Sequence, residues 1–328
     1  MRRSCGAPAG WRSGLGQARW RAWRSRWGCI RGGVSLPDRA DLFRDLAPYP
    51  RITSRHRIWV KPEEDKTMRG LVGKRILVAG AGSGIGRELS IRLAEEGADV
   101  LVAGISKHKL PQTAELAIAA ALAAGRTNHV ATHAFDIAES VSIAELIQAC
   151  SDKLGGLDGV VIPAAEVGLA SMRADVALPD ADPAIWDRVM HVNITGHMML
   201  MQAALPLLKA AGGGSIVTIS SMSAYLGRPS LPAYAASKAG LHGLIRHVAR
   251  LAGADGIRCN GVAPGLVMED GRELPDPDMT KIMLEGQSLK RIGRYTDIAG
   301  VIAFLLSDDA GWITGQVISA NGGFAFRD

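Results

Sequence analysis

The sequence has few cysteines and no long apolar run. Its four cysteines, Cys5, Cys29, Cys150 and Cys259, form no C-x-x-C pair, and two of them fall in the unusual N-terminal stretch. This spacing argues against a disulfide framework and a zinc site, and it fits a reducing, cytoplasmic location. The longest apolar runs, such as 116–124, are far shorter than the roughly 20 residues that span a membrane. We therefore expect a soluble protein without a membrane span or a bound metal.

A basic surplus is also missing from most of the chain. The whole chain carries +6, but residues 1–67 hold 13 Arg and 2 Lys against 6 acids, a net +9. Subtracting +9 from +6 leaves −3 for residues 68–328. A groove for nucleic acid is therefore not supported there. With 328 residues and 47% hydrophobic content, the chain is long enough for one large α/β domain and an extension.

Residues 1–67 have no acid before Asp38 and are rich in Arg, Gly and Trp. They show neither strand alternation nor a helical stripe, so we expect a disordered extension. A transit peptide would also be rich in Arg and poor in acids, and a basic membrane-surface segment could use the tryptophans. Because Met68 stands directly before the first expected strand, the extension could also be an upstream addition to the reading frame or a dispensable tail. We place the folded domain at residues 68–328.

A glycine-rich turn follows the first strand-like run. RILVAG is followed at once by AGSGIG and then by an amphipathic stretch that ends at Gly97. Gly80, Gly84 and Gly86 have the spacing G-x-x-x-G-x-G, which lets the backbone turn tightly and approach a pyrophosphate at a helix N-terminus. The order strand, glycine turn, helix predicts a dinucleotide-binding site.

The second strand, ADVLVAG, ends without an acid. It stops at Gly104, 18 residues after Gly86, where an Asp or Glu would hold the ribose hydroxyls of NAD. The chain continues with Ile105, Ser106, Lys107, His108 and Lys109. These small and basic residues favour NADP, although the two lysines could instead solvate the next helix.

Strand-like and helical stretches alternate along the rest of the domain. A third strand, HVATHAF, delivers Asp136 and Ile137 to the expected adenine edge, although Asp136 could instead cap the next helix. The alternation predicts a single doubly wound, Rossmann-type parallel sheet of about seven strands, with helices on both faces and the ligand at the carboxyl ends of the strands. The segment Leu266–Leu289 follows such an end and is a candidate for a mobile lid.

A serine, a tyrosine and a lysine follow one another at fixed spacing. Ser221, Tyr234 and Lys238 are separated by 13 and then 4 residues. On a helix, Tyr234 and Lys238 share one face, and a nearby ammonium favours the phenolate form of a tyrosine whose pKa is otherwise about 10. Ser221 stands at a strand terminus, where it could hydrogen-bond a substrate oxygen. This arrangement is typical of a carbonyl/alcohol redox site. Asn193 lies in an apolar helix, where an asparagine usually satisfies a local hydrogen bond.

These motifs together resemble the short-chain dehydrogenase/reductase family from about Gly70 to the C-terminus. The family's T-G-x-x-x-G-x-G turn is AGAGSGIG here, its asparagine context is HVNITG, and its N-x-x-x-P-G is found at 260–265. The serine lies 13 residues before Y-x-x-x-K, and the C-terminal signature is DDAGWITGQVISANGG. Motif order and spacing agree throughout.

The resemblance implies roles for the catalytic residues. Tyr234 would be the general acid/base and Ser221 would orient and polarise the reacting oxygen. Lys238 would lower the tyrosine pKa and bind the nicotinamide ribose, and Asn193 would hold a proton-relay water. The positions that we expect to contact the cofactor are Gly80, Gly82, Ser83, Gly84, Ile85, Gly86, Ser106, Lys107, Asp136, Ile137, Ala164, Tyr234, Lys238, Pro264, Gly265 and Val267.

Two positions depart from the family pattern. The family's N-N-A-G is Ile162-Pro163-Ala164-Ala165 here, which removes two amides that help to hold the central sheet together. The threonine that often follows P-G-x-V/I-x is Glu269, whose carboxylate could repel a phosphate.

The leading interpretation is an NAD(P)-dependent oxidoreductase that interconverts an alcohol and a ketone by hydride transfer, with NADP favoured over NAD. One alternative is a catalytically weak, dinucleotide-binding regulatory or scaffold protein of the same fold, which the two departures motivate. Another is an RNA- or membrane-associated protein that acts through residues 1–67. The family resemblance implies a homotetramer or homodimer, and the apolar helices around 186–208 and Tyr234 offer surfaces for it.

Overall fold

The computed structural model describes residues 68–269, 281 and 284–326. These residues belong to one compact unit, Asp65–Asp328. The predicted disordered extension, residues 1–67, lies outside the described residues. So do 270–280 and 282–283, which form much of the predicted lid.

The centre of the fold is a parallel sheet of seven strands in the order β3-β2-β1-β4-β5-β6-β9. The chain builds β1, β2 and β3 outward in one direction and then crosses back to place β4 beside β1. The carboxyl ends of β1 and β4 therefore flank the point where the winding reverses, which is where open α/β sheets bind ligands. The predicted doubly wound sheet is confirmed. The strands are β1 (Arg75–Ala79), β2 (Asp99–Gly104), β3 (Val130–Ala134), β4 (Gly159–Ile162), β5 (Gly214–Ile219), β6 (Ile257–Pro264) and β9 (Val317–Ala320).

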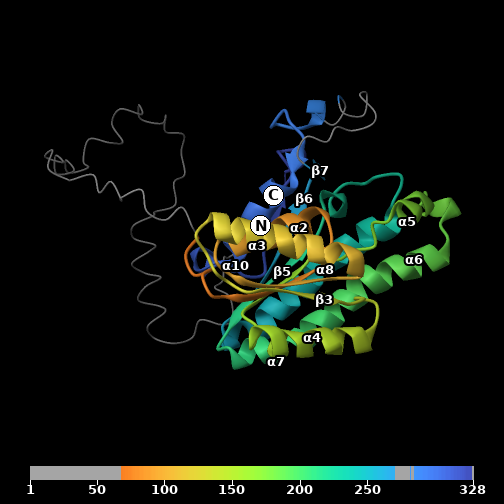
Figure 1. Ribbon diagram of the computed structural model, residues 1–328. Helices are drawn as coiled ribbons and strands as arrows, with labels where there is room; N and C mark the ends of the chain where they lie inside the picture. Colours follow the sequence, from red (N-terminus) through yellow and green to blue (C-terminus); the bar gives the residue numbers. More distant parts are fainter. Residues whose placement is uncertain (1–67, 270–280, 282–283, 327–328) are drawn as a thin grey trace, which may run out of the picture. The chain divides into compact units, whose positions relative to one another are not determined.

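Helices cover both faces of the sheet (Figure 1). Because neighbouring strand residues point to opposite faces, Leu77 and Ala79 of β1 join one core, and Ile76 and Val78 join the other. The first core packs against α4 (Ser140–Leu154), α7 (His197–Ala210) and α8 (Pro232–Ala252). The second packs against α2 (Gly84–Glu95), α3 (Leu110–Ala123) and α10 (Tyr295–Leu306).

Five shorter elements lie near the carboxyl edge of the sheet. Helix α5 (Leu169–Ala174) and helix α6 (Pro183–Met190) follow β4, and a π-helical turn, His191–Gly196, joins α6 to α7. Strands β7 (Val267–Met268) and β8 (Gly293–Arg294) pair in parallel. This pair joins the two ends of the segment that contains the predicted lid.

The apolar surplus expected on the two candidate interface helices is smaller than the sequence suggested. Leu200, Met201 and Leu208 of α7 are buried in the core of this chain, as are Leu241 and Ile245 of α8. Met198 remains 40% exposed on α7, and Leu251 is 61% exposed on α8. The apolar stripes of α7 and α8 are wider than one helix face because each helix packs against both the sheet and neighbouring helices. No described helix is long and apolar enough to cross a membrane.

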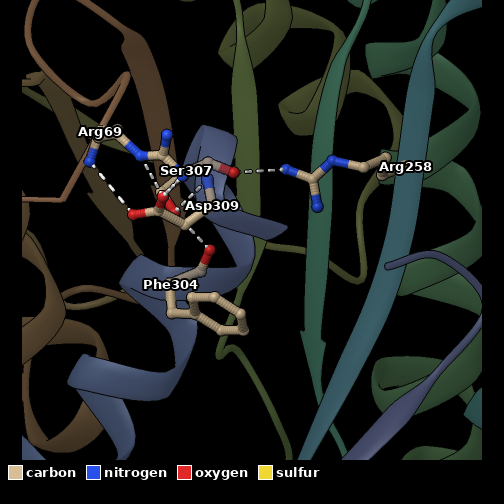
Figure 2. Close-up of polar contacts among 5 residues, drawn as sticks. All are labelled: Arg69, Arg258, Phe304, Ser307 and Asp309. Carbon is tan, nitrogen blue, oxygen red and sulfur yellow. Dashed lines mark hydrogen bonds and ion pairs between the residues drawn. The ribbon is translucent and has the colours of Figure 1, made fainter. Parts of the chain in front are cut away.

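Arg258 of β6 satisfies carbonyls at the end of α10 (Figure 2). Its guanidinium donates to the carbonyl oxygens of Leu305 at 2.7 Å and Ser307 at 3.1 Å. The last carbonyls of a helix have no partner within the helix and carry partial negative charge, so a cation is well placed there. The contact fixes α10 against the sheet, and α10 in turn packs on α2.

The same corner holds the chain just before β1. Arg69 pairs with Asp309 (Figure 2), and the Asp308 backbone amide donates to the Arg69 carbonyl at 3.0 Å. The Met68 backbone amide donates to a carboxylate oxygen of Glu96 at 2.8 Å. The start of the described chain is therefore tied to α2 and to the segment after α10.

We predict that a protein beginning at Met68 keeps the unfolding midpoint, the assembly state and the activity of the full chain. Its new terminal ammonium would lie beside Glu96, where it strengthens an existing contact. Thermal unfolding, light scattering and enzyme assay of both chains measure this. A monomer formed from an oligomeric parent, or an inactive protein, would show that residues 1–67 belong to the working structure.

Candidate active site

The glycine turn at the carboxyl end of β1 leaves no room for a side chain at Gly80 or Gly86. A Cβ on Gly86 would lie 2.1 Å from the Gly80 carbonyl oxygen, and one on Gly80 would lie 2.4 Å from the Ala164 nitrogen. Ser83 at the start of α2 makes no capping hydrogen bond with its side chain. The first amides of α2 are thus presented to a ligand, and the helix N-terminus favours negative charge. The turn fits a pyrophosphate.

A cleft of about 800 Å³ runs along the carboxyl edge of the sheet from this turn. It brings together nearly all of the site residues predicted from the sequence. The predicted residues that line it are Gly80, Gly82, Ser83, Gly84, Ile85, Gly86, Ser106, Asp136, Ile137, Ala164, Ser221, Tyr234, Lys238, Pro264, Gly265 and Val267. Lys107 and Asn193 do not line the cleft.

The adenosine end of the cleft has no acid at the end of β2. Gly104 and Ser106 line the wall, whereas Lys107 is exposed on a short 3-10 turn, so its contact with a cofactor stays a prediction. Lys109 lies beside the glycine turn, because a Cβ on Gly82 would be 3.6 Å from the Lys109 Cβ. Of the two lysines predicted to favour NADP, Lys109 is therefore the one that lies beside the glycine turn.

Asp136 lines the cleft and also stabilises the backbone after β3. Its carboxylate accepts the Ala138 amide at 2.9 Å, and its own amide donates to the Ser142 hydroxyl at 2.9 Å. Glu139, and not Asp136, occupies the N-cap position of α4. The alternative that Asp136 caps α4 is therefore wrong: its carboxylate stabilises the turn after β3, and the residue lines the cleft.

Lys238 of α8 is a buried amine whose tip lies at the end of β5. It is 2% exposed, and its Nζ donates to the Ile219 carbonyl oxygen at 2.8 Å. Burial lowers the pKa of Lys238 to about 7, because the charged form loses its hydration. An ammonium has three donors, so two remain for other partners. Lys238 therefore gains or loses its proton near neutral pH.

Tyr234 lies one turn before Lys238 on α8, as predicted, and Lys238 Nζ is 5.7 Å from its ring centroid. The predicted depression of the tyrosine pKa is not found in this structure. Burial raises the pKa of Tyr234, and a hydrogen bond with Ser221 opposes that rise. The phenol is thus held in its protonated form beside Ser221.

Asn193 lies behind the cleft, in the π-helical turn between α6 and α7. Its side-chain oxygen accepts the Glu166 amide at 2.8 Å, and its nitrogen donates to the Ser237 hydroxyl at 3.0 Å. The Ser237 hydroxyl donates in turn to the Tyr234 carbonyl at 2.7 Å. Asn193 therefore joins the chain after β4 to the Tyr234 helix, and its role with a relay water stays a prediction. Single π-helical turns often mark functional sites.

A histidine supports the altered segment after β4. His197 Nε2 lies 2.9 Å from the Ala164 carbonyl oxygen, and Nδ1 lies 3.4 Å from the Thr218 hydroxyl. Burial and the nearby Lys238 lower the pKa of His197 to about 3, so the ring is neutral and one nitrogen donates. His197 thus helps to hold β4 to β5 where the family's two amides are absent. No sequence pattern singled it out.

Tyr295 and Glu269 also line the cleft near the glycine turn. A Cβ on Gly84 would lie 3.7 Å from the Tyr295 ring and 3.9 Å from its hydroxyl. Glu269 is exposed in the cleft wall, as its position after Val267 predicted. Tyr295 was missed because it begins a helix far along the chain from the other glycine-turn residues. Its hydroxyl adds a polar group to the cleft wall beside Gly84.

The fold and the cleft together define an oxidoreductase that uses a nicotinamide dinucleotide. The chain belongs to the short-chain dehydrogenase/reductase family: the family model described as enoyl-(acyl carrier protein) reductase matches residues 80–325. A probable short-chain type dehydrogenase/reductase of Bradyrhizobium diazoefficiens is 39% identical over 253 residues, which cover 76% of this chain and 87% of the relative.

Two further relatives carry more specific names. The human (3R)-3-hydroxyacyl-CoA dehydrogenase is 37% identical over 254 residues, which cover 75% of this chain and 94% of the human protein. The solved structure of a 7α-hydroxysteroid dehydrogenase complexed with NADH and 7-oxo glycochenodeoxycholic acid has a TM-score of 0.69 and 31% identity. The match covers 77% of this chain and 94% of that one.

The buried lysine predicts an unusual dependence of stability on pH. The folded pKa of Lys238 is about 7 against 10.5 when exposed, so the unfolded chain binds more protons between these values. The cost of burying the charge is full below pH 7 and disappears as pH rises toward 10.5. Relative to Lys238→Met, the wild-type free energy of unfolding should rise by up to about 1.4 kcal/mol per pH unit in this window. Urea unfolding of both proteins across the window tests this; parallel curves would contradict the low pKa.

Proposed function

We propose that the protein interconverts an alcohol and a ketone by hydride transfer to or from NAD(P). The observation that carries the proposal is that Ser221, Tyr234 and Lys238 line one cleft with the glycine turn. A dinucleotide in that cleft would supply the hydride chemistry. The protein's own residues then have to orient the reacting oxygen and move its proton.

Each of the three side chains has a distinct task in this proposal. Tyr234 donates its phenolic proton to the developing alkoxide in reduction, or accepts the hydroxyl proton in oxidation. Ser221, already hydrogen-bonded to Tyr234, donates to the same oxygen and fixes its position. Lys238 uses its remaining donors for the nicotinamide ribose and supplies positive charge as the phenolate forms. Asn193 holds the helix that carries the pair.

The names of two relatives support the alcohol/ketone assignment. One is a 3-hydroxyacyl-CoA dehydrogenase, and the other is a 7α-hydroxysteroid dehydrogenase solved with a 7-oxo compound. Both names describe oxidation at a carbon that bears a hydroxyl. The two substrates differ widely in size, so they support the reaction type and leave the substrate of this chain to experiment.

A panel of secondary alcohols and ketones, assayed with NAD(H) and NADP(H), tests the proposal through the absorbance of the reduced nicotinamide. We expect turnover of at least one pair. Dinucleotide binding without turnover across the panel would favour the alternative, a catalytically weak binding protein of the same fold. Glu269 in the cleft wall is the observation that keeps this alternative open.

We predict that Tyr234→Phe abolishes turnover and leaves cofactor affinity nearly unchanged. The substitution removes only the ionisable hydroxyl, while the ring still packs beside Lys238. Because general acid/base groups contribute about 10²–10⁴-fold, a variant that retains more than about a tenth of the wild-type kcat would exclude this role. Cofactor titration by fluorescence serves as the control for an intact cleft.

We also propose that NADP is preferred over NAD, because β2 ends without an acid and Lys109 lies beside the glycine turn. Gly104→Asp should reverse the preference by adding a partner for the ribose hydroxyls and repelling the 2′-phosphate. The new Cβ would meet only ordinary contacts, at 3.5 Å from Leu110 and 3.6 Å from Ala81.

Dissociation constants for NADPH and NADH measure this preference in the wild type and in Gly104→Asp. Gly300→Asp is a matched control, since it adds the same charge on α10 at a position with nothing within 4 Å of the new Cβ. Tighter binding of NADH by the wild type would show that the end of β2 does not select the cofactor.

For assembly, we propose a homotetramer or homodimer in which the outer faces of α7 and α8 take part. Met198 and Leu251 supply exposed apolar surface on these helices. The described cysteines, Cys150 and Cys259, are free and buried, which agrees with the proposed reducing, cytoplasmic location.

A further inference from the structure

The helix that carries Tyr234 begins against an acid from a distant part of the chain. Asp175, which follows α5 and is 5% exposed, accepts the Ala233 amide at 3.2 Å and the Tyr234 amide at 2.9 Å with its two carboxylate oxygens. Its main-chain carbonyl accepts the Leu231 amide at 2.9 Å. One residue therefore holds three successive amides at the start of α8.

The start of α8 needs this partner because its own sequence provides none. The first helical amides lack acceptors within a helix, and the residue at the cap usually supplies one. Here the cap is Leu231, whose side chain has no acceptor. Leu231 also has φ 65° and ψ 44°, a left-handed conformation that is strained for a leucine and is kept only where surrounding contacts fix it. Pro232 follows and carries no amide.

The main chain of Tyr234 is held from both sides by one segment. Asp175 accepts its amide, and the Ser237 hydroxyl, itself bound by Asn193, donates to its carbonyl. Asn193 also accepts the Glu166 amide, so both contacts lead back to the chain between β4 and α6. Glu166 is fixed in turn by Ser171 and Arg188. The position of the phenol thus depends on Asp175 and on the contacts that join Glu166, Asn193 and Ser237.

We propose that Asp175 is a positioning residue for catalysis, which sets the placement of the Tyr234 phenol relative to Ser221 and Lys238 by capping α8 from outside the helix. The proposal rests on the proposed function of Tyr234 as the proton donor and acceptor. Asp175 does not line the cleft, and its contact with Tyr234 is to the main-chain amide, not to the phenol. Losing it lets the first turn of α8 shift or fray, which misplaces the hydroxyl while the glycine turn stays intact.

The test compares Asp175→Asn and Asp175→Ala with the matched control Asp182→Asn in the full chain. Asp182 is also an acid that caps a helix beginning with proline, since it accepts the Ala184 amide at 2.9 Å at the start of α6. It lies outside the cleft lining. Three quantities are measured: kcat, the dissociation constant for NADPH, and amide hydrogen exchange of a peptide covering residues 231–238.

We expect kcat to fall by about 10²-fold in Asp175→Ala, because small misplacements of a reacting group cost about that much. In Asp175→Asn, kcat should fall less, since the one remaining side-chain oxygen can accept a hydrogen bond from one of the two helix amides. The NADPH dissociation constant should stay unchanged in both, and exchange of 231–238 should accelerate. Asp182→Asn should change none of the three. Asp175→Asn, which keeps the shape of the side chain, carries the test if Asp175→Ala does not fold.

Wild-type kcat in Asp175→Asn would overturn the proposal. So would an equal loss in Asp182→Asn, or a loss confined to NADPH affinity. A loss that disappears at lower temperature together with a lowered unfolding midpoint would show a structural role only, and would also overturn it. If the wild type turns over no substrate, the proposed function fails first, and the exchange measurement still decides whether Asp175 holds the start of α8.

Discussion

The site depends on keeping the Lys238 ammonium out of water. A buried lysine is costly, and proteins usually pair it or let it lose its proton. Here the side chain is 2% exposed, the Ile219 carbonyl accepts one donor at 2.8 Å, and burial lowers the pKa of Lys238 to about 7. The charged form of such a group is unfavourable until a ligand provides further hydrogen-bond acceptors. The contacts around it hold the Lys238 side chain in place before a ligand binds.

The supports of Lys238 and Tyr234 come from three directions. The end of β5 supplies the Ile219 carbonyl and the Ser220 hydroxyl, which donates to the Lys238 carbonyl at 3.1 Å. The π-helical turn supplies Asn193, which reaches the Tyr234 helix through Ser237. Neutral His197 fixes the chain just after the neighbouring strand, β4, through the Ala164 carbonyl. All of these contacts lie at the carboxyl edge of the sheet, next to the point where its winding reverses.

Much of this arrangement could be predicted from the sequence because it is local. The glycine motif spans seven residues, and the Tyr234–Lys238 pair spans one turn of helix. The sheet followed from the alternation of strands and helices. Contacts between distant residues could not be predicted: Asp175 reaches an amide 59 positions away, and His197 and Tyr295 meet their partners only after folding. The prediction of a lowered Tyr234 pKa was wrong because sequence spacing indicates a nearby charge and says nothing of burial. Here burial has the larger effect and raises the pKa.

The central claim is that Lys238 is held without its full charge until a dinucleotide fills the cleft. Isothermal titration calorimetry with NADPH, in buffers of different ionisation enthalpy and about one pH unit above the Lys238 pKa of about 7, measures the protons taken up on binding. The account predicts uptake of nearly one proton by the wild type and far less by Lys238→Met, because new acceptors raise the pKa of Lys238. Equal uptake by the two proteins would contradict it.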